Sequence, residues 1–207
     1  MDFGEQMMDK KYFIDQLKEL SEHLGMGLSE EILEKVITFS RFKVFSKGEI
    51  IAREGDRVSV AGIVLSGVVR SYYVDKDGND ITQWFSAEGN WCADSGMLGF
   101  DEMKANWEAI EDATVMIFDV KQMKELIMSD EQLKILWIEV LESGMRYKVY
   151  RENGFLIENA TERYLAFRKR YPGLSERVPL RYIATYLGIT PESLSRIRSA
   201  MKEKTTE

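Results

Sequence analysis

Apolar residues along the chain change their spacing twice, which divides the sequence into three stretches. Spacing of three or four residues predicts short amphipathic helices over 9–24 and 29–39, with Ser29 as the N-cap of the second. From about Phe42 to Asp119, short runs rich in β-branched and aromatic residues are separated by glycines, which is typical of a β-roll or barrel. A helical pattern returns after that stretch, so the expected fold class is α+β.

Two glycine-containing turns divide the β stretch into strands. The runs 63–65 and 68–70 flank Ser66-Gly67 and are predicted to be two strands across a tight turn. The runs 70–74 and 80–85 flank Asp77-Gly78-Asn79. Because Gly78 can supply the positive φ that a hairpin turn needs, these two runs are predicted to form a β-hairpin.

A stretch without proline, from Ser129 to about Asn153, carries apolar residues in a seven-residue rhythm. It predicts a helix of roughly 37 Å, at 1.5 Å per residue. Such a helix can pack on its own domain or form a dimer seam, and its length favours the seam. The residues expected in the seam are Leu133, Leu136, Val140, Tyr147 and Tyr150.

Three further helices are predicted near the C-terminus, over 158–171, 179–187 and 191–202. Gly188 lies in the short turn between the last two, while Thr190 is the expected N-cap and Pro191 the first helical residue of the last. Two short helices joined by a glycine-containing turn are typical of the helix-turn-helix motif.

Charge is distributed unevenly between the two parts of the chain. The net charge is −7, from 28 basic and 35 acidic residues, which by itself argues against a nucleic-acid partner. Residues 158–207, however, hold ten basic and six acidic residues and carry +4, which leaves −11 for residues 1–157. The basic part is the part that contains the helix-turn-helix pattern.

Side chains on and around the last helix are suited to reading DNA. An arginine can fork onto guanine and a glutamate can accept from cytosine, while short serines allow close approach. The alternative is a generic helical hairpin with a solvated Glu–Arg pair. The candidate DNA-binding residues are Arg181, Thr190, Glu192, Ser193, Ser195, Arg196, Arg198 and Lys202.

Several classes of function lack the residues that they need. Cys92 is the only cysteine and His23 the only histidine, which excludes an internal disulfide and a four-thiolate metal site. The sequence shows no nucleophile beside a base and no phosphate-binding glycine loop. We therefore expect that the protein is not an enzyme and binds neither a metal ion nor a cofactor. The longest nearly apolar run has ten residues and no secretory signal is visible, so a cytoplasmic protein without a membrane partner is expected.

The motifs Phe45-x-x-Gly48-Glu49-x-Ile51, Gly55-Asp56 and Ile63-x-Leu65-x-Gly67-x-Val69-Arg70 resemble the opening of the cyclic-nucleotide-binding roll of the Crp/Fnr family. The long helix and the motif Ile-Thr-Pro-Glu-Ser-Leu-Ser-Arg-Ile-Arg follow in that family's order, so the resemblance covers residues 10–204. Within the family, the sequence is similar to the Bacteroidetes-type branch. It implies a cyclic-nucleotide-binding-like sensor (a double-stranded β-helix with flanking helices) over 1–128, a dimerisation helix over 129–156 and a helix-turn-helix DNA-binding domain over 157–207.

The resemblance also identifies a candidate effector pocket. In members that bind cyclic AMP, a Gly-Glu pair holds the ribose and an arginine holds the cyclic phosphate. Here Asp94 stands near the glutamate position and Lys104 near the phosphate, and no arginine occurs between Arg70 and Arg146. Because an ammonium lacks the guanidinium fork, this cassette is expected to be degenerate and its effector to be something other than cyclic AMP. The candidate pocket residues are Trp91, Cys92, Asp94, Lys104 and Trp107.

The function that these features imply is that of a homodimeric transcription regulator, which reads a palindromic operator with the helix over 191–202. Its implied partners are double-stranded DNA, a second copy of the chain, RNA polymerase and an unknown small-molecule effector. The alternative is a sensor or adaptor whose output is a protein–protein contact and whose helix-turn-helix is vestigial.

Overall fold

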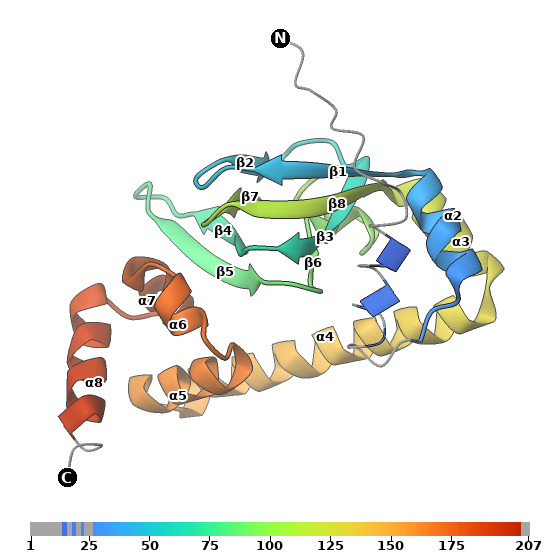
Figure 1. The fold of residues 1–207 in the computed structure, drawn as a ribbon. Helices are drawn as coiled ribbons and strands as arrows, with labels where there is room; N and C mark the ends of the chain where they lie inside the picture. Colours follow the sequence, from blue (N-terminus) through green and yellow to red (C-terminus); the bar gives the residue numbers. More distant parts are fainter. Residues whose placement is uncertain (1–13, 16–17, 20–21, 23–26, 204–207) are drawn as a thin grey trace.

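The computed structural model describes residues 14–15, 18–19, 22 and 27–203 (Figure 1). Most of the helix predicted over 9–24, together with His23, lies outside the described residues. The helix predicted over 29–39 is α2 (Glu30–Thr38). The hydroxyl of Ser29 accepts a hydrogen bond from the backbone N–H of Ile32 at 3.4 Å, which confirms Ser29 as its N-cap.

Eight strands form two four-stranded antiparallel sheets, with strand orders β1-β8-β3-β6 and β2-β7-β4-β5. Both sheets contribute to one apolar cluster, which includes Phe45, Val64, Val69 and Trp107. The β-roll predicted between Phe42 and Asp119 is therefore confirmed. The strands are β1 (Ser40–Phe45), β2 (Ile50–Ala52), β3 (Val60–Ser66), β4 (Val69–Val74), β5 (Asp80–Ser86), β6 (Trp91–Cys92), β7 (Asn106–Ala109) and β8 (Ala113–Asp119).

The two predicted turns have different roles. β4 and β5 pair antiparallel around Gly78, whose φ is 83°, so the predicted hairpin is confirmed. The strands predicted on either side of Ser66-Gly67 are also present, as β3 and β4, but they belong to different sheets and do not pair with each other. Gly67 therefore lies at a corner between the sheets, with a φ of 86°. A Cβ at this position would lie 2.7 Å from the Cα of Ala113, so only glycine fits there.

Two helices follow the roll where the sequence predicts one. The 3₁₀ helix η1 (Asp94–Gly96) lies within the roll, and after β8 come α3 (Val120–Ser129) and α4 (Glu131–Ile157). Asp130, between them, has an extended backbone, and its carboxylate accepts a hydrogen bond from the N–H of Leu133 at 2.9 Å, so it caps α4. The predicted long helix is thus present with a start two residues later, and Ser129 belongs to α3. No helix among the described residues is long and apolar enough to cross a membrane.

The C-terminal helices lie at the end of α4 that is far from α2 and α3 (Figure 1). The first begins at a capping box made by Asn159 and Glu162, which reciprocally satisfy each other's backbone N–H groups. The pair predicted over 179–187 and 191–202 is present within one residue of its predicted bounds. The four helices are α5 (Ala160–Arg170), α6 (Leu174–Arg177), α7 (Leu180–Leu187) and α8 (Pro191–Glu203). The division into domains at 128 and 156 stays a prediction.

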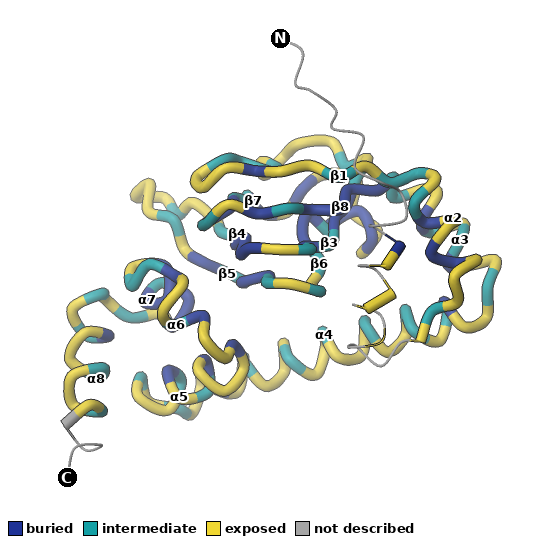
Figure 2. The backbone as a smooth tube through the Cα atoms, viewed as in Figure 1, coloured by how far each residue is buried: buried dark blue, intermediate teal, exposed yellow. Residues whose placement is uncertain are grey.

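α4 has two apolar sides. On one side Leu133 is buried and Leu136 packs against the cluster beneath the roll, while the hydroxyl of Tyr147 contacts that of Tyr186 on α7. Val140 is half-buried and Tyr150 is exposed. At 100° per residue, the opposite side presents a second apolar stripe, which is exposed to solvent (Figure 2). This exposed stripe consists of Ile135, Ile138, Leu141, Met145, Val149 and Leu156.

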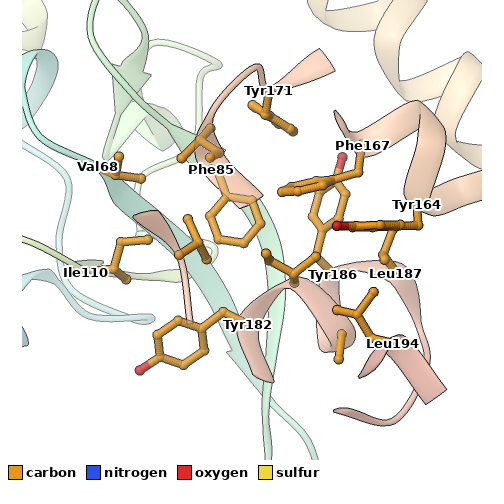
Figure 3. Packing of buried hydrophobic residues seen from close by; sticks show 14 residues of the cluster. Val68, Phe85, Ile110, Tyr164, Phe167, Tyr171, Tyr182, Tyr186, Leu187 and Leu194 are labelled. Atoms are coloured by element: carbon orange, nitrogen blue, oxygen red, sulfur yellow. The ribbon is translucent and has the colours of Figure 1, made fainter. Parts of the chain in front are cut away.

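One apolar cluster joins the roll to the C-terminal helices (Figure 3). Phe85 of β5 lies at its centre, with its ring centroid 5.9 Å from that of Phe167 and 5.4 Å from that of Tyr186. Val68 and Ile110 extend the cluster into the roll. The C-terminal helices thus share a buried core with the roll and do not merely contact its surface.

The corner at Gly67 provides a test of this fold. Replacement of Gly67 by Ala is expected to cost about 1–2 kcal/mol for the left-handed backbone, and about 1–3 kcal/mol more for the clash with the backbone at Asp112 and Ala113. Gly78→Ala is the matched control, because Gly78 has a similar φ of 83° but open space around its Cα. The free energy of unfolding, measured in urea, should fall further for Gly67→Ala. Equal losses would contradict the close approach at the corner.

Candidate nucleic-acid interface and sensor pocket

The turn between α7 and α8 is closed by its own backbone. Gly188 ends α7 in the left-handed region, with a φ of 68°. The N–H of Gly188 donates to the carbonyl of Thr185 at 3.1 Å, and the N–H of Ile189 donates to that of Ala184 at 3.0 Å. These bonds satisfy carbonyls that the helix end leaves open. Ala184 is fully buried, as expected for a small residue where two helices meet.

The first turn of α8 is fixed by a cap and an apolar anchor. Thr190 caps the helix, since its hydroxyl accepts from the N–H of Ser193 at 3.3 Å. Leu194 is completely buried, and Ile197 and Met201 pack against the same cluster. The opposite side of α8 is solvent-exposed (Figure 2). It presents Glu192, Ser195, Arg196, Ser199 and Lys202, with Ser193 and Arg198 half-buried beside them.

Polar groups at the front of α8 are linked to one another. The guanidinium of Arg196 donates to the hydroxyl of Ser193 at 3.3 Å, and the hydroxyls of Thr190 and Ser193 lie 3.2 Å apart. The backbone N–H at the helix start and the Thr190 hydroxyl lower the pKa of Glu192, so this carboxylate is ionised at neutral pH. Within residues 27–203 no ion pair shorter than 4.0 Å joins Glu192 to Arg196. Both side chains are therefore directed to solvent rather than to each other.

Arg70 of β4 connects the roll to α7, a role that the sequence did not reveal. Its side chain is 1% exposed. Its guanidinium forms ion pairs with Asp80 and with Glu108, the latter at 2.8 Å, and donates to the hydroxyl of Thr82 at 3.0 Å. It also stacks on the ring of Tyr182 of α7, 3.5 Å from the ring centroid. An arginine within a strand was the available sequence signal, but its partners come from three separate segments, β5, β7 and α7.

Two further arginines connect the C-terminal helices to the roll by hydrogen bonds and ion pairs. Arg151 of α4 donates to the backbone carbonyls of Gln83 and Tyr186, and so joins α4, β5 and α7. Arg177 at the end of α6 forms ion pairs with Glu88 and Glu111, which lie in loops of the roll. Arg181, by contrast, is exposed on α7 and donates to the hydroxyl of Tyr182 at 2.6 Å. α7 and α8 are thus held in a defined position beside the roll.

Of the candidate effector-pocket residues, Cys92 and Trp107 share one buried cluster, whereas Trp91 and Lys104 lie elsewhere. Trp91 packs against the rings of Phe118 and Trp137, on the side of the roll that faces α4. Cys92, the next residue, lies in the roll interior, where burial and, to a smaller extent, Asp94 raise the pKa of its thiol. Trp91 and Cys92 point to opposite faces because side chains alternate along a strand.

Asp94 occupies an unfavourable environment for a carboxylate. Burial raises the pKa of its carboxyl group above the usual 3.8, and a backbone hydrogen bond and, to a smaller extent, the charge of Lys148 of α4 partly offset that rise. Ala93, directly before it, has a φ of 50°, and no other non-glycine residue among those described has a positive φ. A left-handed alanine costs about 1–2 kcal/mol, so the backbone at this point is strained.

The cation expected near the phosphate position is exposed on a surface loop of the roll. The ammonium of Lys104 lies 4.0 Å from Glu102 and 5.5 Å from the ring centroid of Phe100, and its side chain is 51% exposed. Trp107 and Met103 are buried in the apolar interior instead. The interior therefore contains tryptophan and methionine side chains, and the ammonium of Lys104 lies outside it.

Residues 42–130 match the family described as cyclic nucleotide-binding domain. The chain is similar in structure to FixK2 from Bradyrhizobium japonicum (TM-score 0.69, 23% identity, 80% of this chain and 86% of that one). It is also similar to the c-di-GMP responsive global regulator CLP of Xanthomonas campestris (0.68, 14%, 86% and 93%). A third similar structure is the sensor domain of the transcriptional regulator DNR from Pseudomonas aeruginosa (0.58, 18%, 72% and 95%). No curated protein matches the sequence.

The described residues contain no group of three His, Cys, Asp or Glu side chains able to hold a metal ion.

The filled interior predicts that cyclic AMP and cyclic GMP do not bind with useful affinity. A buried cyclic phosphate needs a cation and hydrogen bonds to replace its water, and loss of a bidentate guanidinium contact costs roughly a hundredfold or more in affinity. Isothermal titration with each nucleotide at millimolar concentration should show no saturable heat. Saturable binding of one nucleotide per subunit in the micromolar range would contradict this reading of Lys104 and Trp107.

Proposed function

The chain carries a cyclic nucleotide-binding domain within the fold of the Crp/Fnr-type regulators, and on this premise we propose that it is a dimeric transcription regulator that binds DNA through α8. In this proposal α8 enters the major groove and the roll is the sensor. The proposed site of action is the cytoplasm, and the proposed protein partner is RNA polymerase.

The exposed, capped front of α8 is the observation that carries the proposal. A recognition helix needs one side anchored in a core and the other free to meet base edges. Leu194 supplies the anchor, and Glu192, Ser195 and Arg196 supply the free side. Arg196 is suited to guanine, and the ionised Glu192 to the amino group of cytosine.

Residues around this front are suited to phosphate contacts. Thr190 and Ser193 carry hydroxyls at the N-terminus of α8, where the helix dipole favours an anion. Arg181 and Lys202 are exposed on α7 and on the last turn of α8, and Arg198 is half-buried beside the front. We assign these cations to the DNA backbone, where they position the protein without reading sequence.

We propose that a second copy of the chain covers the exposed stripe of α4. The stripe lies opposite the side that packs on the roll, so a partner can reach it without disturbing the chain's own core. Ile138, Met145 and Leu156 are 54%, 63% and 75% exposed, and the spacing of seven between Ile138 and Met145 suits a helix pair. Two copies of one stripe satisfy the self-complementarity of a twofold dimer.

DNA reading by α8 is tested by two arginines with different expected roles. Arg196→Ala is expected to lose about 1–3 kcal/mol at the preferred operator and to relax the preference at one base pair. Arg198→Ala is expected to weaken binding to all sequences about equally and to reduce the salt slope by about one. The measurement is a titration of selected and random DNA at several salt concentrations.

Arg41→Ala is the control, because Arg41 is exposed on β1 of the roll and should leave both quantities unchanged. An Arg196→Ala variant that binds the selected operator as tightly as the parent would refute the assignment of α8. A parent protein whose DNA affinity does not fall with salt would instead favour a sensor or adaptor with a protein–protein output.

The dimer seam is tested by Met145→Asp combined with Val149→Asp. Two carboxylates buried in an apolar seam cost several kcal/mol, so sedimentation should show a folded monomer with weak binding to a palindrome. Val44→Asp is the matched control, because Val44 is 65% exposed on β1 and should leave the dimer intact. A double variant that remains dimeric would place the seam elsewhere.

A further inference from the structure

A small cavity lies where α4 meets α5 and α7, outside the sensor interior and away from the front of α8. Its volume is about 40 Å³. Its walls come from all three helices and include Tyr147, Arg151, Glu158, Arg163, Arg170 and Tyr186. Neither the proposed dimer seam nor the proposed DNA contact uses this cavity.

Three guanidinium groups line the cavity without a carboxylate partner. Within residues 27–203, no carboxylate oxygen lies within 4.0 Å of the guanidinium nitrogens of Arg151, Arg163 or Arg170. Glu158 is the one acidic residue in the wall, and its carboxylate turns back toward Gly154. The wall therefore carries a net positive charge that the protein itself does not neutralise.

Backbone carbonyls and aromatic rings hold these arginines in place. Arg163 donates to the carbonyls of Leu187 and Glu158, at 3.1 and 2.6 Å. Arg170 lies 5.0 Å from the ring centroid of Tyr147. These contacts orient the cations without cancelling their charge, as an anion site requires.

Hydrogen-bond donors at the cavity remain unused. The Nε of Arg151 is buried and has no hydrogen-bond partner, although the two terminal nitrogens of that guanidinium are bonded to carbonyls. The hydroxyls of Tyr147 and Tyr186 contact each other, and that contact uses one of their two protons. Burial raises the pKa of Tyr186 well above its usual range, so its hydroxyl keeps its proton at neutral pH. An unpaired buried donor is costly, and an acceptor in the cavity would relieve that cost.

The size of the cavity limits the ligand. One water needs about 10–15 Å³ of such space, so 40 Å³ holds about three small atoms or groups. A wider groove of about 370 Å³ adjoins it and shares Tyr147, Arg151 and Phe155, which provides a route from solvent. We propose that this junction cavity binds a small planar oxyanion of three or four heavy atoms, held by Arg151, Arg163 and Arg170.

Binding is tested with nitrate and formate on the full chain. Gluconate, which is too large for the cavity, serves as the reference anion. The thermal unfolding midpoint is measured as nitrate replaces gluconate at constant ionic strength. The expected result is a saturable rise in the midpoint with half-saturation at about 1–10 mM, a range consistent with so small a ligand. In parallel, the ¹³C signal of labelled formate should broaden with the protein and sharpen when nitrate is added.

Arg170→Gln and Arg168→Gln form a matched pair for this test. Both arginines are exposed on α5, but only Arg170 lines the cavity. Arg170→Gln is expected to raise the half-saturating nitrate concentration about tenfold and to abolish formate broadening, whereas Arg168→Gln should behave as the parent. A midpoint that does not saturate, equal behaviour of the two variants, or equal competition by sulfate would overturn the proposal.

Discussion

One buried cation links the position of α7 to the interior of the roll. Removing the guanidinium of Arg70 from water costs several kcal/mol, which is recovered only if its partners hold it with good geometry. Asp80 and Glu108 supply opposite charge from β5 and β7, and Tyr182 supplies its ring from α7. Because the same cation needs all three, α7 cannot move from β5 without leaving a buried charge less well compensated. The direction in which α8 points therefore follows from a contact made inside the roll.

Local signals in the sequence were sufficient for most of the elements. Ser29, Gly78, Gly188 and Thr190 are each recognisable by the chemistry of a cap or a turn, and each lies where that chemistry predicts. The boundary at Asp130 was missed because a helix-capping aspartate between two helical patterns is easily absorbed into one long helix. The turn at Gly67 was identified, but which strands pair across it depends on the sheets and not on the turn.

The candidate site was predictable only in part. The front of α8 follows from helical periodicity and from its cap, so its exposed side chains could be identified from spacing alone. The spread of Trp91, Cys92 and Lys104 over different environments could not, because it depends on how the strands and the loop before β7 are directed. On α4, periodicity detected an apolar helix, but with apolar residues on two sides it did not tell which side meets the roll. The roles of Arg151 and Arg163 were not predicted because their partners are backbone carbonyls, which every residue carries and which therefore cannot be identified from residue types.

The cluster around Phe85 has a consequence for how the molecule comes apart. Residues of the roll and of all four C-terminal helices, α5 to α8, share this core, so separating the two parts would expose the aromatic rings of both. Each part would lose burial of rings that typically cover 150–250 Å². The roll and the C-terminal helices are therefore expected to unfold as one cooperative unit, with a single melting transition.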